Sequence, residues 1–294
     1  MSKDTHISHF INNEQRTEVK EIYSLGADEI SKLLEGVRPG ELCVFYGDIA
    51  SGKTALSIRM LDYQSIDNGV PSLFFCVRDT PESIVHRLIG YRCSIPYRSF
   101  QVKKDSVDTE ILLQQNQIAK SPIYLYQSQF VMIDDVCDIC KQHVDEFGVK
   151  IVFLHCLYIG GKDKALRLRL LARELGIVIV LLVNQLIFGE GIYGFRPCLK
   201  DLGEDNLNEY GDIIIGLCDY ERYHLYQDAS GRDLRGLIHV EILKSRDGLP
   251  GGEYYTRKDY LHLKNYVAPH LITPSWQPKE RYFDNDSSED LVFP

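Results

Sequence analysis

Short apolar runs alternate along the chain with longer segments in which hydrophobic residues recur at helical spacing. Five apolar runs of strand length lie at 41–46, 73–77, 123–126, 150–154 and 177–183. Between the last two, residues 162–175 form an amphipathic pattern rich in leucine that stops at Gly176, as a helix does. Apolar strands separated by helices are typical of a parallel sheet covered on both faces. The pattern therefore predicts an α/β fold.

Capping residues mark where two further helices begin. Residues 80–82, Thr-Pro-Glu, place a capping hydroxyl, a proline at the first helical position and an acid in the first turn. We expect this helix to end near Cys93. The acidic pair at 134–135 predicts a second helix start, and Gly148 its end.

The last apolar runs differ from the earlier ones. Residues 213–217 form a continuous run, whereas 237–243 alternate apolar and polar side chains and lead to an Asp-Gly turn at 247–248. Alternation of this kind indicates a strand with one solvated face. We therefore expect an antiparallel C-terminal edge to the sheet.

Composition and charge limit the organisation and partners of the chain. Its 294 residues, 44% of them hydrophobic, suffice for one large domain. We predict a flexible arm at 1–20, a folded α/β core at 21–275 and an acidic disordered tail at 276–294. The formal charge of −9 gives no global basic surface for nucleic acid, so any DNA contact is expected to be local.

The motif that carries chemistry joins the first predicted strand to the first helix. It is a full G-x-x-x-x-G-K-[ST] match, made of Gly47, Asp48, Ile49, Ala50, Ser51, Gly52, Lys53 and Thr54. The glycines let backbone N–H groups converge on an anion, Lys53 reaches the β/γ-phosphates and Thr54 offers a hydroxyl to Mg²⁺. A glycine-rich turn that holds no ligand is the alternative interpretation.

Other features argue against membrane and zinc chemistry. We find no run of about 18 apolar residues and no signal-peptide pattern, so we expect a cytoplasmic protein with no membrane contact. The spacing of Cys137 and Cys140, with His143 nearby, is metal-like. It falls in a predicted helix without a second cysteine pair, which favours a structural role over a zinc site.

Several further segments, in this order, resemble the motor domain of DnaB-type replicative helicases, a branch of the RecA-like P-loop ATPases. They are Leu33–Glu41, Phe74–Leu88, Leu171–Gly176, Asn184–Leu186, Arg196–Pro197 with Asp201–Leu202, and Lys244–Gly248. The resemblance runs from about Leu25 to Glu253. It implies a homo-oligomeric ring with ATP between subunits and Gln185 as a γ-phosphate sensor. It also implies that Lys244 and Arg246 enter the neighbour's site.

Three working positions of that family are changed. His155 stands where an aspartate holds the Mg²⁺ water, and Arg78 stands where a glutamate polarises the attacking water. Gly203 replaces an arginine that grips the DNA backbone. Simpler interpretations stay open: His155 as a core histidine, Arg78 as a surface residue paired with Asp79, or Asp79 as the true catalytic acid, which would need a bulge or bend in its strand.

Together these observations predict that nucleotide binding and turnover are separated. A general base contributes ~10²–10⁴ in rate, whereas the phosphate cradle is intact. We therefore expect ATP or ADP to bind, with weakly held Mg²⁺, and hydrolysis to be impaired in a nucleotide-dependent assembly or regulatory factor of DNA transactions. Single-stranded DNA is expected to bind weakly. The alternatives are an active hexameric helicase or translocase, and a scaffold that has lost nucleotide affinity.

Overall fold

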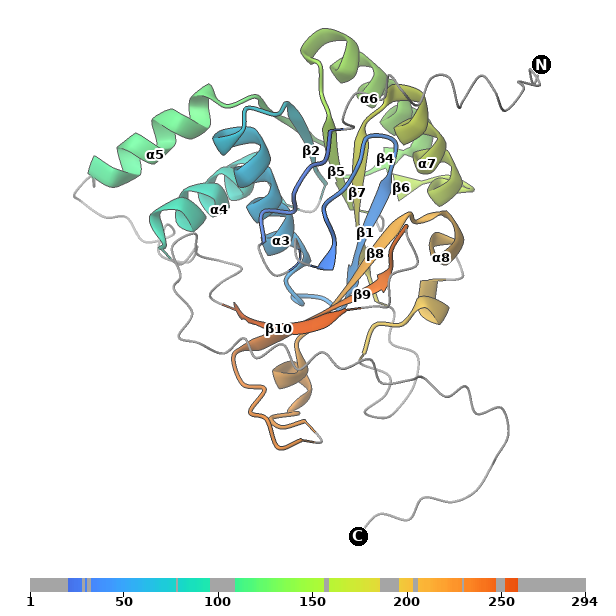
Figure 1. The fold of residues 1–294 in the computed structure, drawn as a ribbon. Helices are drawn as coiled ribbons and strands as arrows, with labels where there is room; N and C mark the ends of the chain where they lie inside the picture. Colours follow the sequence, from blue (N-terminus) through green and yellow to red (C-terminus); the bar gives the residue numbers. More distant parts are fainter. Residues whose placement is uncertain are drawn as a thin grey trace, which may run out of the picture.

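One mixed sheet forms the centre of the molecule (Figure 1). The computed structural model describes residues 21–27, 30, 33–77, 79–95, 109–155, 159–185, 196–202, 206–228, 230–246 and 252–258. Within these residues, eight strands are joined in the order β10-β9-β8-β1-β7-β5-β2-β3. They are β1 (Leu42–Gly47), β2 (Ser72–Cys76), β3 (Ile123–Gln127), β5 (Ile151–His155), β7 (Val178–Asn184), β8 (Ile213–Cys218), β9 (Leu237–Lys244) and β10 (Glu253–Arg257). The short strands β4 (Val131–Met132) and β6 (Ile159–Gly160) pair with each other.

Strand directions follow the hydrophobic pattern. The strands from β8 to β3 in the sheet order all run parallel, and β1, β2, β5 and β8 are buried over their whole length. Strand β9 pairs antiparallel with β8, and β10 antiparallel with β9. The predicted α/β fold and its antiparallel edge are confirmed, with β10 as an additional strand. The turn predicted at 247–248 lies outside the described residues.

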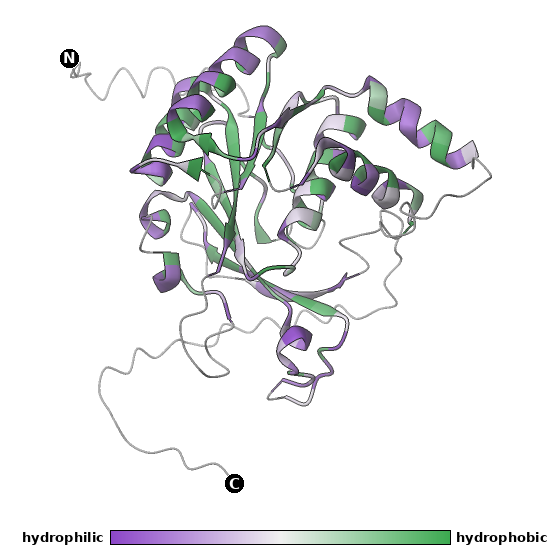
Figure 2. Ribbon diagram, turned by 180° about the vertical axis from the view of Figure 1, so that it is seen from behind, coloured by the Kyte–Doolittle hydropathy of each residue, from purple (hydrophilic) through white to green (hydrophobic). Residues whose placement is uncertain are grey.

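Helices cover the sheet in two groups. They are α3 (Lys53–Leu61), which continues as the π-helix η1 (Asp62–Asp67), α4 (Pro81–Cys93), α5 (Thr109–Lys120), α6 (Ile133–Phe147), α7 (Lys164–Leu175), α8 (Leu207–Tyr210), and the 3₁₀ turns η5 (Leu199–Leu202) and η6 (Tyr220–Tyr223). Figure 1 shows α3, α4 and α5 on one side of the sheet and α6 and α7 on the other. The apolar strands lie between polar outer helix faces (Figure 2).

Local capping explains where most helices begin and end. The Thr80 hydroxyl oxygen accepts a hydrogen bond from the Ser83 N–H at 3.2 Å, as predicted for the start of α4. Helix α6 begins at Ile133, one residue before the predicted acidic pair. The Asp135 carboxylate, in the first turn, accepts a hydrogen bond from the Met132 N–H at 3.4 Å and so caps the helix. Gly148 ends α6 in the left-handed conformation at a φ of 66°.

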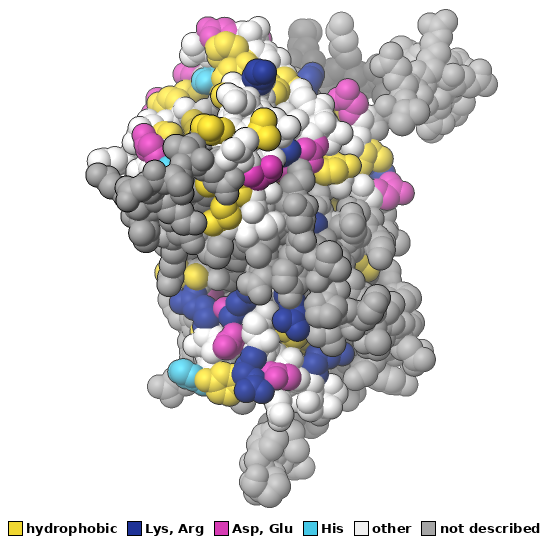
Figure 3. All heavy atoms as spheres, turned by 90° about the vertical axis from the view of Figure 1, so that its left-hand side faces the viewer, with side chains coloured by type: hydrophobic (Ala, Val, Ile, Leu, Met, Phe, Trp, Pro, Cys, Tyr) yellow, Lys and Arg dark blue, Asp and Glu magenta, His cyan; other side chains and the backbone are white. Residues whose placement is uncertain are grey.

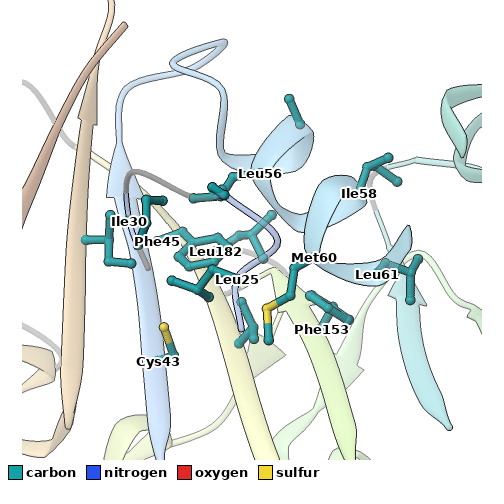
Figure 4. Packing of buried hydrophobic residues seen from close by; sticks show 14 of the residues in the cluster. Leu25, Ile30, Cys43, Phe45, Leu56, Ile58, Met60, Leu61, Phe153 and Leu182 are labelled. Atoms are coloured by element: carbon teal, nitrogen blue, oxygen red, sulfur yellow. The ribbon is translucent and has the colours of Figure 1, made fainter. Parts of the chain in front are cut away.

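Alternate strand residues build two apolar layers. On β1, Phe45 joins the layer under α3 and α4, whereas Val44 joins the layer under α6 and α7. Figure 4 shows the first layer, where Leu56 and Met60 of α3 lie over Phe45 of β1 and Leu182 of β7. Because every central strand is buried on both sides, the sheet holds its strand ends in fixed positions.

Helix α5 is attached differently from the others. No side chain of α5 is fully buried, although Ile118 packs partly against the core. Arg92 of α4 donates to the Gln114 and Gln117 side chains of α5 at 2.6 and 2.9 Å. The same guanidinium donates to Asp62 of η1 at 2.8 Å. The Arg92 side chain therefore links α4 to both α5 and η1 through polar contacts.

Two sequence predictions concern regions that the structure does not describe. The predicted arm at 1–20 and the tail at 276–294 both lie outside the described residues. Within the described part of the chain, no helix has both the length and the apolar character needed to cross a bilayer.

Candidate nucleotide-binding site

The candidate loop lies at the carboxyl end of the parallel strands. Gly47 ends β1 and is aligned with Asn184 at the end of β7 and with Leu217 near the end of β8. In parallel α/β sheets, ligands bind at this edge, where loops connect strands to helices. The loop also leads directly into α3, so its anion site would lie on a helix N-terminus.

Steric limits and backbone angles require the observed loop residues. A Cβ at Gly47 would lie 2.2 Å from the Leu217 carbonyl oxygen, so no larger residue fits there. Gly52 precedes α3 with a φ of 102°, a region that side chains rarely adopt. Ala50 also has a positive φ, of 60°. The close approach at Gly47 and the positive φ at Gly52 therefore fix the curled backbone of the loop.

Lys53 is folded into this cradle. Its Nζ donates to the carbonyl oxygens of Gly47 and Asp48, both at 2.7 Å, and the residue is only 5% exposed. These neutral acceptors can be exchanged for phosphate oxygens without moving the lysine out of the loop. The residues present fit a bound nucleotide phosphate.

The fit to Mg²⁺ is only partial. Thr54 lies in the first turn of α3, where the sequence places its hydroxyl for the cation. His155 ends β5 and is buried, and Ile151 and Phe153 of the same strand belong to the layer under α3. By strand alternation His155 faces that same side. It offers nitrogen where Mg²⁺ prefers carboxylate oxygen.

The end of β7 adds two polar residues between the loop and His155. Gln185 is buried, and its backbone N–H donates to the Gly47 carbonyl at 2.8 Å, which ties β7 to the loop. Asn184 shares the α3 side of the sheet with His155, because Val180 and Leu182 of its strand lie in that layer. The Asn184 side-chain oxygen is buried without a hydrogen-bond partner among the described residues. Asn184 belongs to a segment that resembles the family, but the sequence assigned no role to it.

A contact that the sequence analysis missed holds the second loop residue. The Tyr223 hydroxyl of η6 donates to the Asp48 carboxylate, and the Arg222 guanidinium lies 3.9 Å from the same oxygen. Burial, together with this hydrogen bond, raises the pKa of Tyr223 above its usual value. An acid inside a phosphate-binding loop is the sequence signal that could have drawn attention to the position.

Other predicted positions are only partly described. Arg78 and Gly203 lie outside the described residues, so their assigned roles stay predictions. Asp79 lies 3.7 Å from Arg87 of α4, a long ion pair. The possible role of Asp79 as the catalytic acid stays a prediction.

Lys244 and Arg246 lie near the amino-terminal ends of the parallel strands, whereas the loop lies at their carboxyl ends. Lys244 pairs with Ile214 near the start of β8, and its Nζ donates to the carbonyls of Asn208 and Glu209 at 3.0 and 2.9 Å. The predicted projection of both side chains toward a neighbour stays a prediction, since both contact their own subunit here.

Arg246 forms a two-point ion pair. Its guanidinium donates to both carboxylate oxygens of Glu41, just before β1, and to the Gly36 carbonyl at 2.8 Å. The side chains of Arg246 and Glu41 are 12% and 13% exposed. The contact therefore fixes the segment that follows β9 against the start of β1.

Two metal-like clusters have structural explanations. Cys140 is buried in α6, and the His143 ring nitrogen Nδ1 contacts the Ile139 carbonyl at 2.8 Å, which agrees with the predicted structural role. In the described part of the chain, one three-residue group has metal-like geometry: His239, Glu241 and Glu253. Arg196 already bridges the two glutamates, at 3.0 and 2.6 Å. The group is therefore an ion-pair network.

This architecture defines the class of protein. A parallel sheet whose first strand leads through a glycine-rich loop into a helix, with polar residues at the neighbouring strand ends, is a RecA-like P-loop ATPase fold. A profile of the DnaB-like helicase C-terminal domain matches residues 24–256, and the chain belongs to that family. The resemblance inferred from the separate motifs is confirmed.

Known relatives agree with this assignment. The chain is 24% identical over 241 residues to the "Replicative DNA helicase DnaB" of Leifsonia xyli subsp. xyli (strain CTCB07), covering 76% of this chain and 51% of that protein. It therefore spans about half the length of this curated relative. The solved "ATPase Domain of G40P" superposes with a TM-score of 0.75 at 20% identity, over 88% of this chain and 98% of that one.

A second solved structure gives the same fold. It is described as a DnaB-like replicative helicase and its interactions with primase, and it superposes with a TM-score of 0.72 at 20% identity. The match covers 88% of this chain and 67% of that one.

Proposed function

We propose that the chain binds ATP or ADP at the loop 47–54 and hydrolyses ATP slowly, and that it serves as a nucleotide-dependent assembly or regulatory factor in DNA transactions. The observation that carries this proposal is the combination of an intact phosphate cradle with His155 at the end of β5. The cradle would retain the nucleotide. His155 takes the place of a carboxylate that hydrolysis would need.

The chain's own groups supply most of what binding needs. Backbone N–H groups at the start of α3 and the Lys53 ammonium would hold the phosphates, and Thr54 would contact Mg²⁺. When bound, Mg²⁺ supplies charge neutralisation at the β- and γ-oxygens. Replacing Asp by neutral His and Glu by Arg changes the formal charge of the site by roughly three units toward positive, which favours a polyanion.

Turnover requires more than binding. An attacking water must be oriented and deprotonated, and a base contributes ~10²–10⁴ in rate. The predicted position of that base is Arg78, a cation that cannot accept a proton near neutral pH. Rate loss at this step is compatible with unchanged affinity, because the cradle and the base act on different parts of the reaction.

The loop and Arg246 lie at opposite ends of the parallel strands, and this arrangement supports assembly into an oligomer. The loop lies at the carboxyl edge of the parallel strands, whereas Arg246 lies beside the start of β1. A contact between these opposite ends of two subunits is heterologous, and such contacts form a ring when the rotation between subunits closes. We therefore propose a homo-oligomer with nucleotide between its subunits.

Nucleotide binding and turnover measured on one purified sample test the proposal. Affinity for ATP and ADP is measured by calorimetry, and phosphate release is followed with and without Mg²⁺ and single-stranded DNA. We expect binding that Lys53→Ala abolishes, together with turnover well below ~1 s⁻¹. Turnover at or above that rate, stimulated by DNA, would instead establish the active helicase or translocase. Equal binding by Lys53→Ala would refute the P-loop assignment.

A further inference from the structure

An acidic residue lies inside the phosphate cradle. Asp48 is the second residue of the loop, and its carbonyl oxygen is 2.7 Å from the Lys53 Nζ. The Asp48 carboxylate is joined to that same residue, so it lies within a few ångströms of the space that phosphates would enter. Two negative charges at that separation repel each other appreciably, since the effective dielectric constant near a protein surface is well below that of water.

The Asp48 carboxylate is held by two hydrogen-bond donors and faces one more distant cation. Its Oδ1 accepts from the Ile49 N–H at 2.6 Å, and its Oδ2 accepts from the Tyr223 hydroxyl. The Arg222 guanidinium, 3.9 Å away and 38% exposed, offers incomplete charge compensation. The carboxylate is thus fixed in place while part of its charge remains effective.

The segment that holds Asp48 is itself anchored. Glu221 accepts from the Gly236 N–H at 2.9 Å and from the Lys258 ammonium at 2.8 Å. Lys258 also lies 2.8 Å from Asp219. Turn η6 is therefore fastened to the β9 and β10 side of the sheet, so Tyr223 and Asp48 cannot easily move away when a phosphate enters.

We propose that Asp48, held by Tyr223, sets the phosphate-number specificity of the site by penalising each added negative charge. The inference rests on the proposed nucleotide binding and deepens it. Because a triphosphate carries more charge than a diphosphate, Asp48 reduces the affinity for ATP more than the affinity for ADP. Its charge therefore biases the site toward the diphosphate.

Removing that charge tests the assignment. We expect Asp48→Asn to raise ATP affinity about tenfold, which corresponds to about 1.4 kcal/mol, and to raise ADP affinity about threefold. Raising the salt concentration should reduce both gains, because screening weakens the repulsion. Affinities are measured by calorimetry without Mg²⁺ and again with it.

A matched control is an acid in the connection between β8 and β9, which also contains Tyr223. Asp233 lies in this connection, and its carboxylate pairs with Arg235 at 2.7 Å instead of with a loop residue. Asp233→Asn changes the net charge by the same amount and should leave both affinities unchanged. Thermal melting of each variant shows that the fold is retained.

A substitution at Tyr223 provides a second, independent test of the role of Asp48. Tyr223→Phe removes the hydroxyl donor but keeps the ring, so it frees the Asp48 carboxylate to turn away from an entering phosphate and should raise ATP affinity. The same change should have little effect in the Asp48→Asn background, because the charge that the hydroxyl holds in place is gone.

The possible outcomes separate the two proposals. Equal effects of Asp48→Asn and Asp233→Asn, or equal gains for ATP and ADP, would overturn the specificity assignment while leaving nucleotide binding established. Absence of binding by the folded wild-type chain would overturn the proposed function, and the specificity assignment with it.

Discussion

At the scale of single residues, the proposed function makes His155 and Arg78 the positions that limit hydrolysis. We expect the double variant Arg78→Glu with His155→Asp to raise ATP hydrolysis by more than the product of the single effects, on the order of 10² or more. The reason is that a base without a metal ligand, or a ligand without a base, leaves the attack incomplete. The measurement is steady-state phosphate release for the wild type, both single variants and the double variant.

Measuring the ATP affinity of the same four proteins shows which step the substitutions change. Unchanged ATP affinity in all four proteins would show that the variants act on the chemical step. If the double variant is no faster than the better single variant, the catalytic acid lies elsewhere, and Asp79 is the first residue to replace.

The sequence predicted the site's residues better than its contacts. The loop, Lys53 and the strand end at His155 follow from local patterns, because a motif and its flanking elements are contiguous. The bond between Asp48 and Tyr223 joins residues 175 positions apart. It depends on β8 lying beside β1, which no local pattern specifies.

At the scale of elements, the end of β9 is joined to the start of β1 by Arg246 and Glu41. We expect Arg246→Ala to lower the free energy of unfolding by about 2–4 kcal/mol, because it leaves the nearly buried Glu41 carboxylate without its cation. Under the proposed function it should also weaken nucleotide-promoted oligomerisation. Chemical denaturation and sedimentation with and without nucleotide measure the two effects.

Glu41→Gln separates these roles. It removes the same ion pair but keeps the arginine, so it should destabilise the fold and preserve assembly. If both variants lose assembly equally, the contribution of Arg246 is to folding alone, and its role toward a neighbour is refuted.

The β9 and β10 edge contains a pH-dependent contact. A hydrogen bond from His239, with further help from Arg196, lowers the pKa of Glu253 from 4.5 to about 2. The folded state therefore gains stability above pH 4.5, and this gain disappears as the pH falls toward 2. Because the Glu253 side chain is half exposed, we expect Glu253→Gln to cost less than about 1 kcal/mol at pH 7.

Thermal melting as a function of pH checks this expectation. The difference in melting temperature between wild type and Glu253→Gln should shrink from pH 7 to pH 3. A difference that stays constant over this range would show that the carboxylate charge contributes nothing.

Element boundaries were predicted where capping chemistry is local. The start of α4 at Thr80 and the end of α6 at Gly148 follow from single residues. Helix α5 and strand β10 were missed. Helix α5 buries no side chain fully, so packing against the sheet does not impose a continuous apolar face on it, and β10 is an edge strand in which Tyr254 and Tyr255 are only partly buried.

At the scale of the whole molecule, charge limits what the chain can bind. The net charge is −9, and the basic side chains in the lower part of the face in Figure 3 are interspersed with acids. Arg232 and Arg235, for example, pair with Asp228 and Asp233. We therefore expect weak binding of single-stranded DNA with a shallow salt dependence, because few phosphates would be neutralised.

Fluorescence anisotropy with a labelled oligonucleotide at several salt concentrations measures this slope. Arg235→Gln, which removes an exposed cation, should change the affinity little. Tight binding with a steep slope would contradict the expectation and favour a working helicase.

The polar attachment of α5 gives the molecule a part that can open by itself. Arg92 supplies hydrogen bonds to Gln114 and Gln117 of α5, while Leu112 and Leu113 are exposed. Few apolar contacts oppose separation, so amide protons of α5 should exchange with solvent long before those of β1 and β7. In Arg92→Gln this early exchange should accelerate while the sheet stays protected. The chain then consists of two cooperative units of unequal stability within a single domain.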